Sequence, residues 1–375
     1  MNRGLRSEKH FQSCLYRGTK DANGRFDVFG TVTYENGDIV SADFVHGVKE
    51  GQVVMISPRN QNVSRIVGRC VNDKLEGKGK IISAETAVTD CFFRNGCIHG
   101  PVRRFTMKKF REFRQQLDFL GTYQKGKPWG MCWEYREGGG FLVGKVDPSN
   151  GEFSGDEGIA YLYPDLSTAL LGAFVGGTMK AAKSTRLIGV TLDPSTQIMT
   201  PVFAQTLPHQ PVMRYSKATA ESIGHQPMVS DPYEDCTVRV RSSGVEGGGD
   251  GLFAQKDLAK GSMVAFYNGV RLPYRVGVKE EWATSGYKIY INADYESGER
   301  MDIPEECQSL DVYCATLGHK LNHSFRPNCE EWFIDHPRFG RKNIFLFYYI
   351  PSGCSIKLWI GNLKFIRIRE SLFTL

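Results

Sequence analysis

The chain has 375 residues, 41% of them hydrophobic, and this length predicts two or three globular domains. Its formal net charge of +6 is only mildly basic, which argues against a dedicated nucleic-acid-binding protein and against direct readout of a nucleic-acid sequence. The ten cysteines include no Cys-x-x-Cys pair and no Cys/His cluster at zinc-ligand spacing. We therefore expect no metal site, and reduced thiols that fit a cytosolic or nuclear protein.

We expect no secretory signal peptide at the beginning of this sequence. The segment from Met1 to Lys9 lacks the apolar stretch of a signal peptide. The longest strongly apolar run, Ile344 to Ile350, is too short to span a bilayer. We expect an N-terminal tail over residues 1–25 and no transmembrane segment.

Residues 26–180 predict an array of repeats. Each copy has an aromatic or apolar residue, a few turn-forming residues, then Gly and a short strand-like run. Copies begin near residues 44, 70, 92, 123, 146 and 174, at spacings of 22 to 31 residues that suit one two-stranded hairpin per repeat. The glycines supply the positive φ of tight hairpin turns, and the alternation in Gly30 to Tyr34 places every second side chain on one face.

This array resembles MORN repeats, and the resemblance implies stacked hairpins in an elongated, twisted sheet. A single hairpin is only marginally stable in water, so each copy buries its apolar face against its neighbours. MORN repeats in other proteins act as spacers, protein-docking surfaces or membrane-associated modules, and the fold does not decide between these roles.

One segment of the array, Val102 to Arg114, interleaves six basic residues with aromatics. Such a pattern could bind phosphates or anionic lipid. The alternative is that the aromatics line one face of a sheet or helix while the charges are solvated, and we favour this alternative.

Residues 181–235 predict an irregular connector, rich in Pro, Thr, Ser and Gln, that ends in Asp231-Pro232-Tyr233-Glu234. A strand-like run, Val238 to Arg241, then leads into a Gly-rich loop from Ser242 to Ala254. Glycines there allow the backbone to approach a ligand closely. The spacing matches neither a dinucleotide-binding turn nor a P-loop, so by itself the loop is better interpreted as a flexible linker.

Further motifs follow in order along the chain. An apolar run, Met263 to Phe266, ends in Tyr267, and an acidic-Trp-Ala segment contains Trp282. The segment from Gly318 to Cys329 reads Gly-His-Lys-Leu-Asn-His-Ser-Phe-Arg-Pro-Asn-Cys. Taken separately, Tyr267 would be a half-buried core residue, and the Asn-His-Ser sequence would be a polar turn.

In this order the motifs resemble the SET domain of lysine methyltransferases with N-terminal MORN repeats. The resemblance covers about residues 26–340, and it implies a SET-domain β-fold over residues 236–361 with a pseudoknot at the Asn-His-Ser segment. It also implies the cofactor S-adenosylmethionine and a catalysed transfer of a methyl group to a lysine amine. The connector then corresponds to a pre-SET segment.

The resemblance assigns a role to each site residue. Tyr267 and His323 are the expected catalytic residues, and Tyr267 with Trp282 is expected to line the channel that admits the lysine. A narrow, partly apolar channel favours the neutral amine, and alignment of the reacting atoms lowers the barrier further. The expected cofactor-binding residues are Gly248, Gly249, Asp250, Lys320, Asn322 and His323.

The chain departs from the family near its C-terminus. Where the family carries a Tyr-Gly-Tyr segment, this sequence has Ile360-Gly361-Asn362, and residues 362–375 form an atypical tail. The tyrosine expected after Cys329 aligns with Glu331 or, with a gap moved by one residue, with Trp332. Two explanations are a natural pseudoenzyme and an incomplete gene model or alternative isoform that diverges from about Arg341. We favour the second, because Tyr267 and the Asn-His-Ser segment are retained.

The sequence thus predicts a mainly β protein of stacked MORN-repeat hairpins followed by a SET domain. The resemblance implies a histone-lysine N-methyltransferase that acts on the histone H3 tail and on non-histone proteins, in the nucleus at chromatin and also in the cytoplasm. The alternative function is a catalytically inactive SET pseudoenzyme whose MORN surface docks proteins or lipids.

Overall fold

The structure is a computed structural model that describes residues 14–60, 63–83, 87–110, 112–217, 223, 226–243, 249–259, 261–272, 287, 289–290, 300–324, 326–347 and 354–358. The chain divides into two compact units, each of which is described by itself. The N-terminal unit comprises Met1–Tyr135, Gly144–Glu152 and Thr191–Thr200. The C-terminal unit comprises Arg136–Val143, Phe153–Val190 and Pro201–Leu375.

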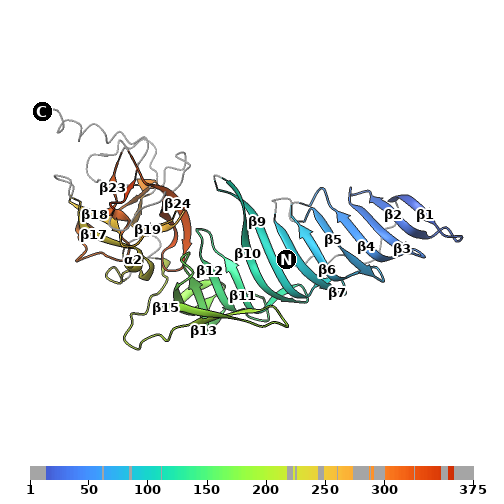
Figure 1. The fold of residues 1–375 in the computed structure, drawn as a ribbon, viewed down its shortest axis with the longest axis horizontal. Helices are drawn as coiled ribbons and strands as arrows, with labels where there is room; N and C mark the ends of the chain where they lie inside the picture. The colour runs from blue at the N-terminus through green and yellow to red at the C-terminus, as the bar shows by residue number, and fades with distance from the viewer. Residues whose placement is uncertain are drawn as a thin grey trace. The chain divides into compact units, whose positions relative to one another are not determined.

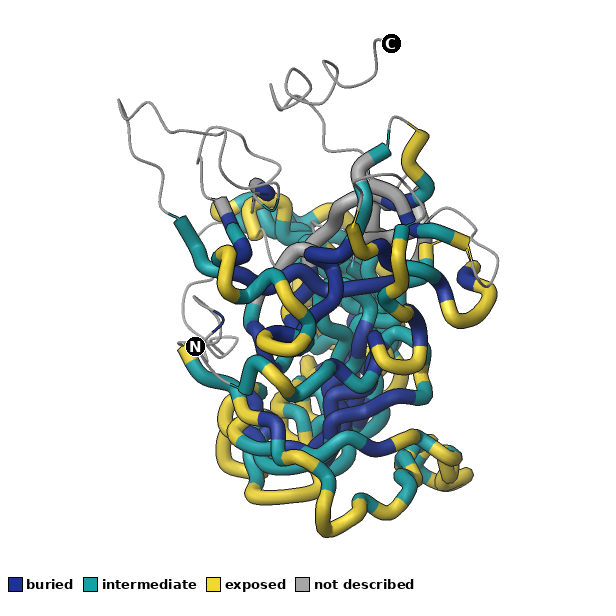
Figure 2. Tube along the Cα trace, turned by 90° about the vertical axis from the view of Figure 1, so that its left-hand side faces the viewer, coloured by how far each residue is buried: buried dark blue, intermediate teal, exposed yellow. Residues whose placement is uncertain are grey.

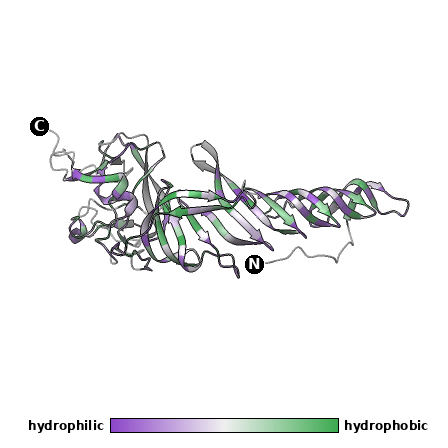
Figure 3. Ribbon diagram, turned by 60° about the horizontal axis from the view of Figure 1, so that its bottom comes forward, coloured by the Kyte–Doolittle hydropathy of each residue, from purple (hydrophilic) through white to green (hydrophobic). Residues whose placement is uncertain are grey.

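The N-terminal unit is a sheet of antiparallel strands that follow one another in chain order (Figure 1). The strands are β1 (Cys14–Lys20), β2 (Phe26–Tyr34), β3 (Ile39–Val45), β4 (Val48–Ile56), β5 (Arg65–Val71), β6 (Lys74–Ile82), β7 (Val88–Arg94), β8 (Cys97–Ile98), β9 (Gly100–Phe110), β10 (Glu112–Gln124) and β11 (Lys127–Tyr135). Hydrophobic and hydrophilic residues alternate along these strands (Figure 3), as half-buried strands require. The prediction of stacked antiparallel hairpins is confirmed.

Tight turns set the repeat. In the turns His46-Gly47, Asn95-Gly96 and Lys125-Gly126, both residues have positive φ, from 50° to 91°. This is the conformation of type I′ turns, whose twist matches that of the paired strands. It explains why Gly recurs at the second position of these turns.

Neighbouring repeats are joined at the same turns. The backbone N–H of Gly47 donates to the carbonyl of Phe26 in the preceding repeat at 2.7 Å. Gly96 donates in the same way to Leu75, and Gly126 donates to Ile98, each at 2.9 Å. In each of these three repeats, the turn thus forms a backbone hydrogen bond to the preceding repeat, which lies one repeat length earlier in the chain.

The sheet begins earlier than the sequence indicated. We expected a tail up to residue 25, but Cys14–Lys20 forms β1 and pairs with β2. The ring of Tyr16 stacks on Phe26 with centroids 3.8 Å apart, and its hydroxyl oxygen would lie 2.5 Å from a Cβ at Gly18. The tyrosine thus fills the space that the glycines Gly18 and Gly30 leave open, and this contact orders the strand.

The C-terminal unit opens with further hairpins, in which β13 pairs with β14 and β14 pairs with β15. Residues Phe141–Val143 of β12 belong to this unit and pair with β13. The bounds of these strands and of the next are β12 (Phe141–Lys145), β13 (Gly155–Leu162), β14 (Thr168–Val175), β15 (Thr178–Leu192) and β16 (Met199–Phe203). The expected irregular connector over 181–235 thus contains most of β15 and all of β16.

The remaining elements surround a second core. They are α2 (Pro232–Thr237), β17 (Val238–Ser242), β18 (Asp250–Ala254), β19 (Met263–Tyr267), β20 (Val270–Leu272), β21 (Ile289–Tyr290), β22 (Arg300–Asp302), η1 (Glu305–Cys307), η2 (Gly318–Lys320), β23 (Asn322–His323), β24 (Cys329–His336), β25 (Gly340–Phe347) and β26 (Lys357–Leu358). They form three small sheets, of which the largest has the order β19-β25-β24-β26-β23. Buried residues occupy the inner stretches of chain, while exposed residues lie mainly on turns (Figure 2).

The segment that diverges from the family still pairs within this unit. β25 pairs along β24 and β19, and β26 runs parallel to β23, with Asn322 opposite Lys357 and His323 opposite Leu358. The pseudoknot stays a prediction. Residues Ile360, Gly361 and Asn362 and the tail 362–375 lie outside the described residues.

No helix within the described ranges is long and apolar enough to cross a membrane.

Candidate functional site

β19 carries Tyr267 into the core of the C-terminal unit. All five residues of this apolar strand are buried, and Tyr267 is 3% exposed. The Tyr267 hydroxyl donates a hydrogen bond to the backbone carbonyl of Tyr287. A tyrosine fixed at its hydroxyl can orient a neighbouring polar group, and the catalytic role that the resemblance implies for Tyr267 stays a prediction. Its predicted partner in the channel, Trp282, lies outside the described residues.

The Gly-rich loop and the Asn-His-Ser segment meet through an ion pair. Lys320, the last residue of η2, is 7% exposed, and its Nζ lies 2.8 Å from Asp250 Oδ2. The same Nζ donates to the carbonyl of Gln308 at 2.8 Å. Asp250 is the first residue of β18, so the pair joins two motifs that are 70 residues apart. Both residues are predicted cofactor ligands, and the structure brings them together.

A second contact between the motifs involves Gly251 and Asn322. A Cβ at Gly251 would lie 2.6 Å from Asn322 Nδ2, closer than real Cβ atoms come to such atoms. Only glycine therefore allows the Asn322 amide to lie against β18. Gly249 has a φ of +61° and is exposed, whereas Gly248 lies outside the described residues.

For His323 the structure describes the backbone alone. It belongs to β23 and pairs in parallel register with Leu358 of β26. Glu331 and Trp332 hold adjacent positions in β24, opposite Phe345 and Ile344 of β25, and their side chains lie outside the description. The proposed catalytic role of His323 and the choice between Glu331 and Trp332 therefore stay predictions.

His319, between these motifs, is a residue that our reading of the sequence did not single out. It is 4% exposed, and among the residues that the structure describes neither ring nitrogen has a hydrogen-bond partner. The ring lies 5.3 Å from that of Tyr313 and 6.3 Å from that of Tyr287. Burial, together with the charge of Lys320, lowers the pKa of His319 to about 3, although the nearby Thr316 backbone opposes part of this shift. At neutral pH the imidazole is uncharged.

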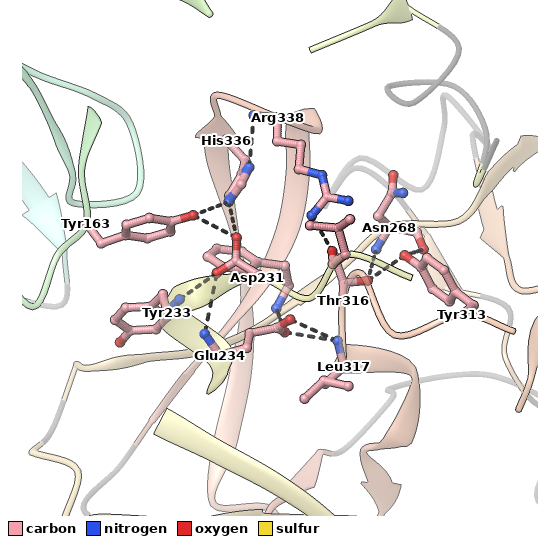
Figure 4. Close-up of polar contacts among 12 residues, drawn as sticks. Tyr163, Asp231, Tyr233, Glu234, Asn268, Tyr313, Thr316, Leu317, His336 and Arg338 are labelled. Carbon is pink, nitrogen blue, oxygen red and sulfur yellow. Dashed lines mark hydrogen bonds and ion pairs between the residues drawn. The ribbon is translucent and has the colours of Figure 1, made fainter. Parts of the chain in front are cut away.

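Helix α2 supplies two buried carboxylates that the sequence reading also missed (Figure 4). Asp231 is the N-cap, and its Oδ1 accepts from the backbone N–H groups of Tyr233 at 3.0 Å and Glu234 at 3.4 Å. Its Oδ2 accepts from the Tyr163 hydroxyl at 2.7 Å and lies 3.1 Å from His336 Nε2. An Asp followed by Pro at the first helical position is a start signal for a helix, so the helix itself was predictable.

Glu234 is the second carboxylate and is fully buried. It accepts from the backbone N–H of Phe266, in β19, and from that of Leu317, which precedes η2. Burial, followed by the nearby Asp231 charge, raises the pKa of Glu234 well above its usual value, while these two hydrogen bonds act in the opposite direction.

In the part of the chain that the structure covers, no group of three or more His, Cys, Asp or Glu side chains could hold a metal ion.

Comparisons with known proteins point to one family. Residues 123–195 match the family described as Histone H3 K4-specific methyltransferase SET7 N-terminal. The chain is also 40% identical, over 224 residues, to a protein of Halocynthia roretzi described as histone-lysine N-methyltransferase SETD7. The match covers 60% of this chain and 56% of that relative, so the chain spans about half the length of the curated relative it matches. The resemblance to SET-domain lysine methyltransferases of the SETD7 type is confirmed.

Solved structures give more distant matches. One is titled "ctPRC2 in an autoinhibited conformation bound to S-adenosylmethionine", with 21% identity and a TM-score of 0.26, covering 34% of this chain and 15% of that one. Another is an active polycomb repressive complex 2 in the basal state, with 22% identity and a TM-score of 0.26, covering 33% and 15%. At such scores these likenesses carry no weight for this chain.

Proposed function

We propose that this chain is an S-adenosylmethionine-dependent protein-lysine N-methyltransferase. The observation that carries the proposal is the meeting of the Gly-rich loop with the Asn-His-Ser segment, through the Lys320–Asp250 ion pair and the Gly251–Asn322 approach. The turn η2 contacts both β18 and β19, so the strand that ends in Tyr267 belongs to the same site. The SETD7-type resemblance supports the same function.

The residues present fit the cofactor. The absence of a Cβ at Gly251 leaves room for the Asn322 amide beside the backbone of β18. Lys320 and Asn322 can donate hydrogen bonds to a carboxylate, and Asp250 can accept them from an ammonium group. By the family motif, Gly248, Gly249 and His323 complete the set. When bound, S-adenosylmethionine supplies an activated methyl group.

The chain's own residues would prepare the lysine. We propose that Tyr267 orients the amine and that the buried surroundings of β19 favour its neutral form, because desolvation lowers the pKa of a lysine. We propose histone H3 and other protein lysines as substrates, and chromatin in the nucleus, with the cytoplasm as a further location, as the place of action.

Substitution of Gly251 tests the cofactor site. In Gly251→Ala the new methyl group displaces the Asn322 amide, because that amide is the nearest atom and sits at the end of a flexible side chain. We expect the Kd for S-adenosylmethionine, measured by calorimetry, to rise about tenfold through the lost hydrogen bond to a charged group.

Gly189→Ala is the matched control, since a Cβ there would meet no described residue within 4 Å apart from its chain neighbours. It should bind as the wild type does. Wild-type affinity in Gly251→Ala would contradict the placement of the cofactor between β18 and Asn322. Turnover is tested by transfer of a labelled methyl group to histone H3.

A silent SET pseudoenzyme is the competing function, because Ile360 and Asn362 replace the two tyrosines of the family motif. Such a protein would bind the cofactor and dock partners through its repeat array without turnover. Cofactor binding without methyl transfer would favour it.

A further inference from the structure

The carboxylate of Glu234 joins two segments of the proposed site (Figure 4). Its Oε1 accepts from the Phe266 N–H at 2.7 Å and from the Leu317 N–H at 3.0 Å. Its Oε2 accepts from the Leu317 N–H at 3.1 Å. The Oε1 atom therefore accepts from two backbone segments: Phe266 precedes Tyr267, and Leu317 precedes η2.

Helix α2 holds β19 at its other end as well. The Tyr233 hydroxyl donates to the carbonyl of Met263, the first residue of the strand, at 2.5 Å. Glu234 follows Tyr233 directly, and Asp231 caps both of their N–H groups. The helix thus fixes β19 at its first and fourth residues, which leaves Tyr267 at the end of a strand with a defined position.

The backbone on the other side of Tyr267 is fixed by a second set of bonds. The Asn268 N–H donates to Thr316 Oγ1 at 3.3 Å, and the Asn268 carbonyl accepts from the Tyr313 hydroxyl at 2.9 Å. The Tyr313 hydroxyl and Thr316 Oγ1 lie 2.7 Å apart. Both neighbours of Tyr267 are therefore tied to the segment that leads into Gly318–Lys320.

Burying the Glu234 side chain lowers the stability of the fold, so stability does not explain its presence. Glu234 is 0% exposed, and among the residues that the structure describes no cation pairs with it. A buried carboxyl group without a cationic partner lowers stability unless its hydrogen bonds compensate. What the carboxylate provides in return is one rigid acceptor between two backbone segments, which an apolar side chain could not supply.

We propose that Glu234 is a positioning residue. Its carboxyl group sets the separation between Tyr267 and the turn η2, which carries Lys320 and leads to Asn322. Thr316 holds the backbone of Asn268, on the other side of Tyr267. The inference rests on the proposed methyltransferase function. It concerns residues that do not touch the substrate but determine where the residues that would touch it lie. Alignment of this kind governs the chemical step more than ground-state binding.

Glu234→Gln tests the inference with a nearly isosteric change. The amide NH₂ that replaces one oxygen cannot accept a hydrogen bond, so a donor faces the Leu317 N–H or the Phe266 N–H. We expect kcat for methyl transfer to fall by about 10- to 100-fold, with KM for cofactor and peptide changing less than about threefold. We also expect the Leu317 or Phe266 amide hydrogen to exchange about tenfold faster, because its acceptor is weakened.

Asp235→Asn is the matched control, because Asp235 is the next residue of α2 and its exposed carboxylate accepts from Ser230 Oγ at 2.6 Å. It should leave kcat and both exchange rates unchanged. Thermal unfolding of every variant establishes that it is folded. If Glu234→Gln does not fold, Thr316→Val removes the acceptor on the other flank and should lower kcat in the same way.

The outcomes are distinct. A fall in kcat at unchanged KM supports the positioning role, whereas wild-type kcat in a folded Glu234→Gln overturns it. If the wild type itself transfers no methyl group, the proposed function fails, and amide exchange alone decides about Glu234. Faster exchange of the Leu317 or Phe266 amide hydrogen then supports the positioning role of Glu234, and unchanged exchange at both overturns it.

Discussion

Replacing Asp231 by alanine is expected to lower the free energy of unfolding by about 3 to 5 kcal/mol, because it leaves several buried hydrogen-bond donors without their acceptor. Asp231 is 0% exposed, and its carboxylate contacts three different parts of the unit. It caps α2, accepts from the Tyr163 hydroxyl at 2.7 Å, and lies 3.1 Å from His336 Nε2. Alanine would leave the buried Tyr163 and His336 without this partner. Urea unfolding at neutral pH measures the change.

Asp235→Ala serves as control, since this residue lies in the same helix and is exposed. It removes an exposed hydrogen bond to Ser230, so we expect a loss of at most about 1 kcal/mol. An Asp231→Ala protein within about 1 kcal/mol of the wild type would contradict the importance of this buried network.

Acidification is expected to destabilise the protein through His319. The folded state holds the pKa of this imidazole at about 3, below its ordinary value of 6.5, because the ring is buried beside Lys320. As the pH falls, the unfolded chain takes up the proton first. The stability that His319 contributes is therefore complete above about pH 6.5 and is lost progressively as the pH falls towards 3.

The comparison with His319→Leu isolates this contribution. Between pH 7 and pH 5 the wild type should lose about 2 kcal/mol more than His319→Leu, measured by urea unfolding at both pH values. His209→Leu, at an exposed histidine, should keep the wild-type dependence. Equal losses in the wild type and His319→Leu would show that His319 is protonated in the folded protein at pH 5.

The repeat array was predictable because its signals are local. A turn such as Asn95-Gly96 needs two positive φ values, which Asn and Gly adopt readily, and the flanking alternation fixes which face is buried. The start of the sheet at Cys14 was missed because it depends on the packing of Tyr16 over Gly18 and Gly30. That contact has no periodic signature at the edge of the array.

Some residues of the proposed site could be named where motifs are contiguous, and their roles stay predictions. Asp250, Lys320 and Asn322 were named from the Gly-rich and Asn-His-Ser segments, and the structure brings all three together. The positions of Gly248, Trp282 and the His323 side chain stay predictions. The sequence order of the motifs, more than any one of them, is the basis on which the candidate site residues were named.

The polar groups beneath the site could not be found in this way. Glu234 acts on residues 32 and 83 positions away, and Asp231 meets Tyr163 and His336 at separations of 68 and 105. Burial of an acidic or imidazole group is unfavourable on its own, so composition predicts such residues on the surface. Only the folded arrangement shows the donors that make their burial tolerable.

Methyl transfer is the most direct test of the proposed function. The purified chain is incubated with histone H3 and S-adenosylmethionine that carries a labelled methyl group, beside a His323→Ala variant. We predict incorporation of label into H3 by the wild type and its loss in the variant. No incorporation by the wild type, while a known methyltransferase labels H3 in the same buffer, would contradict an active enzyme and favour a binding protein.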